Sequence, residues 1–265
     1  MNAIINTIYT QFNGGGALSH GYKTYSSNDN FVPPENGHYI IILSPGHQAS
    51  GNGGSAGSGA YRRYGGSSNY MWSSAGGAGG QGGNALILTP TIIGIDLVAS
   101  DAIPITINSS GISFGNYASI MFGAKAQDGG SGSSYDPVNS YASNPPGGSG
   151  GIGEGEPTIS ILDGITCSVK SMALNTNSSG VAGEQGQRAD NLPVSVFDKY
   201  SGVAFGASAT AGSVLPSSVI PGGKGAGSAP FCFSNTNYNI TYNFPPLQQP
   251  ENGAPEELGK IFVFW

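Results

Sequence analysis

The sequence predicts a fold that is mostly β and irregular, in which short β-strands flank a bundle of extended helices of the polyglycine-II type, with essentially no α-helix. Three observations lead to this prediction. Glycine recurs at every third residue in several stretches. Short apolar runs are bounded by turn residues. No long segment has apolar residues at the 3.6-residue period of an α-helix.

The glycine spacing is clearest in residues 76–84 and 147–155, where glycine-rich triplets follow one another. The same step of three separates Gly51, Gly54 and Gly57, then Gly180, Gly183 and Gly186, and also Gly222 and Gly225. Three residues per turn is the period of the polyproline-II helix, which has no internal hydrogen bonds. A face without side chains lets such helices pack so closely that their backbone N–H and C=O groups pair. The alternative, a flexible Gly/Ser linker, is weaker because the glycine runs recur between strand-like segments.

The predicted strands are short apolar runs that end at Gly, Pro, Ser or Asn. They are residues 39–43, 85–88, 103–107, 119–122, 158–162, 165–172, 239–244 and 261–265. A loose repeat connects them, since a strand is followed by a loop, a returning glycine run and a new strand, three times along the chain. We expect one domain over residues 21–265, preceded by a lead segment at residues 1–20. Phe31, Tyr39, Phe262, Phe264 and Trp265 are expected in the core or at a subunit contact.

Composition limits the classes of function. Only 9% of the 265 residues are charged, against roughly 25% in an ordinary soluble domain. The 13 Tyr and 11 Phe nevertheless argue for a folded chain. The net charge of −6, with 9 Lys and Arg in total, argues against a nucleic-acid partner. We expect no membrane insertion, because no run of apolar residues is long enough to span a bilayer, and the N-terminus lacks a secretion signal.

Two cysteines, Cys167 and Cys232, each lie in an apolar strand-like run. They could form one disulfide, although spacing alone cannot pair them. The favoured interpretation is that both are free and buried, because a free cysteine behaves as a small apolar residue.

Several segments resemble the glycine-rich domain of bacteriophage tail fibres. Residues 21–27 (GYKTYSS) and 31–34 (FVPP) are similar to the strand and turn that begin this domain. The β-branched run 39–43 then passes into glycines, as in the family. Residues 86–90 (LILTP) resemble its returning strand, and residues 259–265 (GKIFVFW) resemble its final strand. The stretch 93–115 is longer than the hairpin of the family, so inserted loops are expected there.

The resemblance implies a virion protein, outside the cell as part of the particle, whose loops recognise a host cell-surface receptor. That receptor would be a glycan or an outer-membrane protein. Other virion proteins and a homotrimer are the further implied partners, with residues 1–20 as a candidate attachment to another virion protein. Loops on a rigid scaffold are where binding variety accumulates.

The candidate receptor-binding residues are aromatic residues and arginines, which are enriched at binding hot spots. They are Tyr61, Arg62, Arg63, Tyr64, Tyr70 and Trp72 in a first loop, and Tyr135 and Tyr141 in a second loop. Aromatic faces suit sugars, and arginines bind carboxylates or phosphates. The alternative, in which these aromatic residues pack on a neighbouring subunit, stays open.

The residues give little support for an enzyme, so we expect no catalytic residue, no cofactor and no metal. His20, His38 and His47 are not at metal-binding spacing. Glu154 and Glu156 are a carboxylate pair of the kind that a glycosidase uses, but their glycine-rich surroundings favour solubilising charges on an exposed edge. The alternatives are a purely structural virion protein (a capsid decoration or a connector of fibre and baseplate), a polysaccharide-degrading tailspike, or a secreted glycine-rich surface protein.

Overall fold

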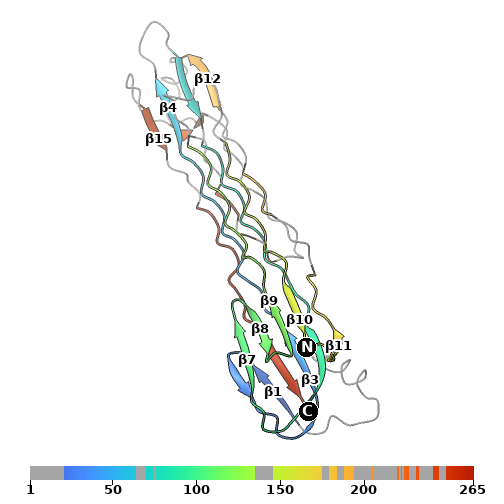
Figure 1. Cartoon of the computed structure of the whole chain (residues 1–265). Coiled ribbons are helices and arrows are strands. Elements are labelled where there is room, and N and C mark those ends of the chain that lie inside the picture. Colours follow the sequence, from blue (N-terminus) through green and yellow to red (C-terminus); the bar gives the residue numbers. More distant parts are fainter. Residues whose placement is uncertain are drawn as a thin grey trace.

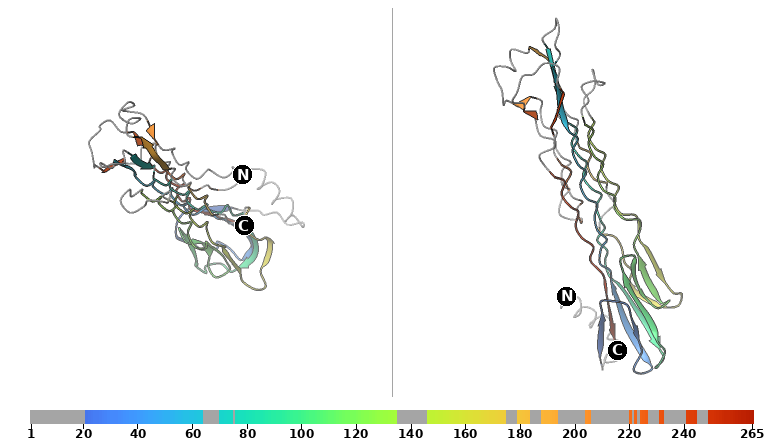
Figure 2. Two further views of the ribbon diagram at one scale, coloured as in Figure 1. Left: turned by 90° about the horizontal axis from the view of Figure 1, so that it is seen from above. Right: turned by 90° about the vertical axis from the view of Figure 1, so that its left-hand side faces the viewer.

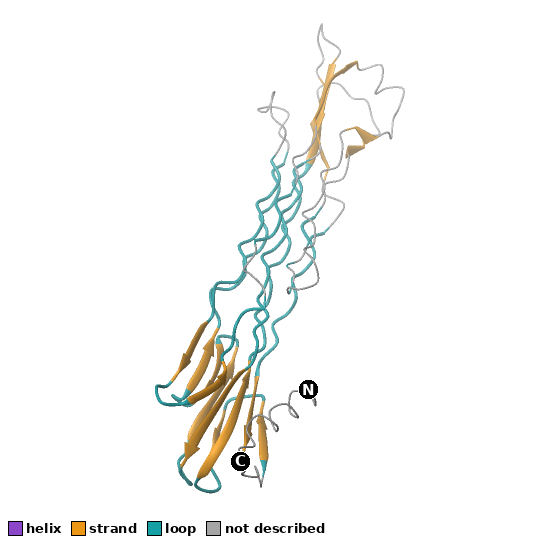
Figure 3. Ribbon diagram, turned by 90° about the vertical axis from the view of Figure 1, so that its right-hand side faces the viewer, coloured by secondary structure: helices purple, strands orange, loops and turns teal. Residues whose placement is uncertain are grey.

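The computed structural model describes residues 21–63, 70–74, 76–134, 146–174, 179–183, 188–193, 204–205, 220, 222, 224–226, 231–232, 241–244 and 249–265. Every regular element in these ranges is a β-strand, and they contain no helix. The prediction of a mostly β and irregular fold is therefore confirmed. The molecule is long and narrow, with strands at its two ends and extended irregular segments between them (Figures 1 and 3).

Two five-stranded antiparallel sheets form the end of the molecule that we call the base (Figure 1). The strands of the first sheet are, in spatial order, β1 (Tyr22–Tyr25), β16 (Lys260–Phe264), β3 (Gly37–Ser44), β6 (Thr91–Leu97) and β11 (Thr166–Val169). Those of the second are β10 (Thr158–Ile161), β9 (Ala118–Met121), β8 (Gly111–Phe114), β7 (Ile103–Asn108) and β2 (Asp29–Phe31).

The core of the base lies between these two sheets. Alternate residues of a strand point to opposite faces, and the residues that β3 and β7 bury in this core follow that alternation: Tyr39, Ile41, Leu43, Ile103, Ile105 and Ile107. The Phe31 ring lies at the centre of an aromatic group, with its centroid 5.7 Å from that of Tyr39 and 5.9 Å from that of Trp265. Burial of large apolar side chains is the main stabilising contribution here.

Phe31 and Tyr39 are buried, as predicted. Trp265 is partly buried and packs against the same core. Phe262 and Phe264 are also partly buried, but they belong to a second, small cluster on the other face of the first sheet, with Ile40, Ile42 and Ile92.

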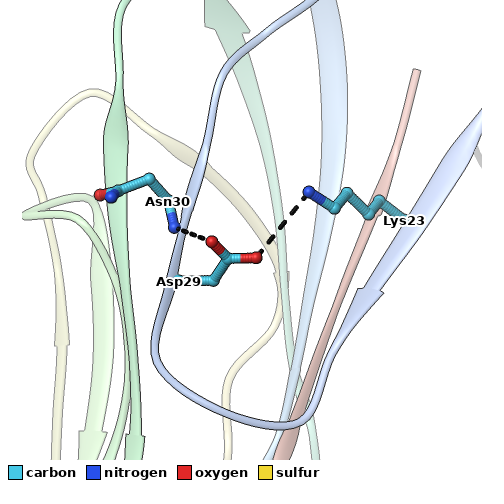
Figure 4. A network of polar contacts seen from close by, with 3 residues as sticks. All are labelled: Lys23, Asp29 and Asn30. Carbon is cyan, nitrogen blue, oxygen red and sulfur yellow. Dashed lines mark hydrogen bonds and ion pairs between the residues drawn. The ribbon is translucent and has the colours of Figure 1, made fainter.

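The described chain begins and ends at the base. Gly21 and Trp265 exchange two backbone hydrogen bonds, each with an N–O distance of 3.1 Å. Next to this pairing, the Lys23 ammonium lies 3.9 Å from the carboxylate of Asp29, which also accepts a hydrogen bond from the backbone N–H of Asn30 (Figure 4). Both side chains of this ion pair are exposed, so it adds little to stability.

A four-stranded antiparallel sheet, which we call the tip, lies at the opposite end of the molecule (Figure 1). Its strands are, in order, β12 (Arg188–Pro193), β5 (Tyr70–Ser74), β4 (Gly59–Arg63) and β15 (Thr241–Phe244). A further pair is formed by β13 (Ala204–Phe205) and β14 (Phe231–Cys232).

Extended segments that lie side by side connect the base and the tip (Figure 2), and we call them together the shaft. They are residues 45–58, 76–90, 122–134, 146–157, 179–183, the described residues of 220–226, and 249–259. Backbone hydrogen bonds join each of these segments to its neighbours. The described segments of the shaft contain no helix or strand of their own. Their backbone N–H and C=O groups therefore pair with those of neighbouring segments.

The hydrogen bonds of the shaft repeat at every third residue. Along residues 76–84, the carbonyl oxygens of Gly77, Gly80 and Gly83 accept from the N–H groups of Gly57, Gly54 and Gly51 at 2.8–2.9 Å. The N–H groups of the same three glycines donate to Ser133, Gly130 and Gln127. The carbonyls of Ala78, Gln81 and Asn84 accept instead from Gly148, Gly151 and Glu154, each at 2.8 Å. Successive residues thus face different neighbours, and residues 76–86 are all buried.

The close approach of the segments requires glycine at these positions. A methyl group at Gly77, Gly80 or Gly83 would overlap a backbone carbonyl oxygen of residues 146–152. Such an overlap with backbone cannot be relieved by rotating a side chain. The glycine runs are therefore determined by the packing of the shaft.

We call residues 76–90 the central segment of the shaft. At Gln81 and Asn84, where this segment has a residue other than glycine, a buried side chain fills the space. The amide of Gln81 donates to the carbonyl of Gly222 at 3.4 Å, and its oxygen accepts from the N–H of Val181 at 3.3 Å. The Asn84 side chain accepts from the N–H of Gly222 at 3.0 Å. These two amides therefore link three segments of the shaft.

Four sequence-based expectations about the base and the shaft are wrong. Residues 85–88 form no strand but two isolated bridges, Ala85 with Ile220 and Leu88 with Ala173, because neither partner belongs to a strand. The stretch 93–115 contains β7 and β8 in place of inserted loops. Cys167 is free but exposed, because the edge strand β11 is exposed along its whole length. Glu154 is fully buried, although Glu156 is exposed as expected. The side chain of Cys232 lies outside the description.

Candidate functional site

The tip brings the first group of candidate residues into one sheet. Tyr61, Arg62 and Arg63 are in β4, and Tyr70 and Trp72 are in β5. The two strands pair in antiparallel register, with Arg62 opposite Trp72 and Tyr61 opposite Ser73. The expected loop is therefore largely a β-hairpin, and its candidate residues lie on the arms of that hairpin.

The neighbouring strands add residues that the sequence analysis did not include. Tyr242 of β15 is the register partner of Tyr61, and Thr241 is the partner of Arg62. On the other side, Pro193 of β12 is opposite Tyr70 and Arg188 is opposite Ser74. Tyr242 lies in a predicted strand and is aromatic, like the other candidates, so the sequence alone could have indicated it as a candidate receptor-binding residue. The polar sequence of β12 gave no such signal.

Three candidates cannot be located. Tyr64, Tyr135 and Tyr141 lie outside the described residues. The residues on either side of the second loop are described, however. The backbone N–H of Ser133 donates a hydrogen bond to the carbonyl of Pro146 at 2.9 Å. The second loop therefore starts and ends at two adjacent segments of the shaft.

The histidines of the described residues occupy separate places in the base and at its junction with the shaft. His38 on β3 contacts the carboxylate of Asp96 on β6 at 2.9 Å, in an exposed position. His47 lies 3.8 Å from a carboxylate oxygen of Glu257. Within the described ranges, no three His, Cys, Asp or Glu residues come together as a metal site would require.

A membrane-crossing helix is likewise not found in the part of the chain that the structure describes. The comparisons with models of known protein families and with curated proteins gave no match for this sequence.

Proposed function

We propose that this chain is a non-catalytic virion protein, a phage tail-fibre or tail-tip component whose tip recognises a receptor on the host cell. The main support for the proposal is that the two ends of the elongated molecule differ. The chain enters and leaves at the base, where Gly21 pairs with Trp265, and the strands that hold the candidate residues lie at the far end (Figure 1). An attachment point and a contact surface at opposite ends suit an adhesive fibre.

The extended segments of the shaft are, in this proposal, helices of the polyglycine-II type. Support comes from the step of three residues between hydrogen bonds to the same neighbour, which equals the number of residues per turn of that helix. Further support comes from the overlap that a Cβ atom would cause at Gly80 and Gly83. A bundle of such helices is a stiff support for the tip.

The receptor-binding surface is the sheet β12-β5-β4-β15, and the proposal also includes Tyr64, Tyr135 and Tyr141. Directly opposed residues of neighbouring strands lie on one face of a sheet, so the register groups Arg62 with Trp72 and, on the other face, Tyr61 with Tyr242. Aromatic and arginine side chains of this kind suit a sugar or an acidic group of a host glycan. An outer-membrane protein is the other class of receptor.

The base is the end that attaches to the virion. Residues 1–20 join the described chain at Gly21, at the base, and are the proposed contact with another virion protein. A homotrimer is the proposed assembly.

The proposal is tested by replacing Tyr61, Arg62, Arg63, Tyr64 and Trp72 together with alanine. The purified variant should bind host cells at least ~10-fold more weakly, since truncating a single hot-spot residue costs about 2 kcal/mol or more and about 1.4 kcal/mol corresponds to a tenfold change. The melting temperature of the variant should match that of the wild type, because the base and the shaft keep their contacts. A matched control replaces the exposed Tyr22 and Lys23 of the base, which should leave cell binding unchanged. Unchanged binding by the folded tip variant contradicts the proposal.

A further inference from the structure

A buried carboxyl group lies where the shaft joins the base. The Glu154 side chain has no exposed surface. The side-chain Oε2 accepts a hydrogen bond from the backbone N–H of Leu86 at 2.7 Å. The backbone N–H of Glu154 donates to the carbonyl of Asn84 at 2.8 Å. The side-chain Oε1 of Glu154 is buried and has no hydrogen-bond partner in the described part of the chain.

A second buried acceptor lies in the same junction. Gln48 is 2% exposed, and its amide nitrogen donates to the carbonyl of Gly123 at 2.9 Å. Gly123 lies against the carbonyl of Gly155, the residue that follows Glu154. The amide oxygen of Gln48, like Oε1 of Glu154, meets no donor among the described residues. Two buried side-chain acceptors of the junction therefore lack a donor among the described residues, although buried acceptors are almost always paired.

Among the described residues, no basic side chain forms an ion pair with Glu154. The coulombic interaction with His47, on the segment after β3, lowers the pKa of Glu154, and the His47 imidazole lies 3.8 Å from a carboxylate oxygen of Glu257, on the segment before β16. Residues 76–90 contain no charged side chain. Lys125 of the segment after β9 and Glu156 of the same segment as Glu154 are exposed. Burial raises the pKa of Glu154, and the Leu86 hydrogen bond and His47 oppose this more weakly.

We propose that Glu154 is held as the neutral carboxylic acid in the folded protein, with its proton on Oε1, and that this buried proton makes the junction of shaft and base sensitive to pH. The neutral acid avoids the free-energy cost of burying an unpaired charge. When the pH rises, the proton leaves to water or hydroxide, and a carboxylate remains buried without an ion-pair partner. That state favours separation of the segment 146–157 from Asn84 and Leu86.

The sign of the pH dependence follows from proton linkage. The folded state keeps the proton in a pH range where the unfolded chain has released it, because the pKa is raised on folding. The contribution of Glu154 to stability is complete below its unfolded pKa, and it is lost as the pH rises through the folded pKa. The protein should therefore be less stable in mild alkali than in mild acid.

The test compares thermal unfolding of the full chain in the wild type, Glu154→Gln and Glu156→Gln between about pH 5 and about pH 9. Glutamine keeps an oxygen for the Leu86 N–H and replaces the O–H by an N–H donor without a titration. The wild-type midpoint should fall with pH relative to that of Glu154→Gln, by roughly 3–5 °C for each unit by which the pKa is raised. Glu156→Gln, at the exposed neighbouring position, should keep the wild-type dependence.

Equal pH dependence in the wild type and Glu154→Gln would overturn the proposal. A second measurement decides the matter if Glu154→Gln does not fold. Wild-type protein with isotope-labelled glutamate should show the infrared band of a protonated carboxyl at about pH 7, where exposed carboxyls are ionised. Among the acidic residues whose burial is described, Glu154 alone is buried, so absence of this band would equally overturn the proposal.

Discussion

At the scale of single residues, the central segment of the shaft combines two kinds of position. Gly77, Gly80 and Gly83 are required because neighbouring backbones occupy the space of a Cβ atom. Gln81 is required for the opposite reason, because its side chain fills a gap and supplies hydrogen bonds to two segments. The glycine positions were predictable from their spacing, whereas the partners of Gln81 were not, since Val181 and Gly222 are distant in sequence.

Replacing Gly80 with alanine should destabilise the protein by about 1–3 kcal/mol or more, the usual effect of an overpacked core. The added methyl group would overlap the carbonyl oxygen of Ser149. Gly37→Ala is the matched control, because nothing lies within 4 Å of a Cβ atom there, and its effect should stay within about 1 kcal/mol. Thermal or denaturant unfolding measures both, and equal stability of the two variants would show that the shaft tolerates side chains at Gly80.

At the scale of elements, the register of the shaft depends on an uninterrupted step of three. A single glycine inserted between Gly80 and Gln81 would shift the rest of this segment by a third of its period. The backbone carbonyls of Gln81 and Asn84 would then no longer accept hydrogen bonds from the N–H groups of Gly151 and Glu154.

This insertion should lower the unfolding midpoint and make the shaft sensitive to protease. The control is an insertion between Asp163 and Gly164, an exposed turn, which should change the midpoint little. If both insertions have the same effect, the three-residue register is not what holds the shaft together.

The elements also show where prediction from sequence succeeds and fails. The run 103–107 became β7, in which alternate residues are buried. The run 39–43 became β3, in which all five residues are buried, alternately in the main core and in the small cluster on the other face of the sheet. The run 85–88 has the same apolar character, but its neighbours leave it with isolated bridges. A strand requires a partner strand, and the composition of a short run does not determine its partner. The arginine–aromatic hairpin of the tip was recognised by composition, and its pairing with β12 and β15 was not.

At the scale of the whole molecule, the long shape is a property that solution scattering can measure. A compact monomer of 265 residues would have a radius of gyration of about 18 Å. The arrangement of base, shaft and tip in Figure 2 should give a radius of gyration clearly larger than that of a compact particle of the measured mass. The mass from the same experiment tests the proposed homotrimer, and a compact particle of monomer mass would contradict the extended arrangement.

By itself, the sequence determined the features that depend on the backbone and on neighbouring residues. These are the three-residue glycine step, the scarcity of helix, and the alternation that makes strands such as β7. Only the tertiary structure decided which distant segments meet: Gly51 with Gly83, Arg62 with Trp72, and Glu154 with Leu86. The physical reason is that many glycine-rich segments are locally equivalent, so their neighbours, and the burial that follows, are selected by the packing of the whole chain.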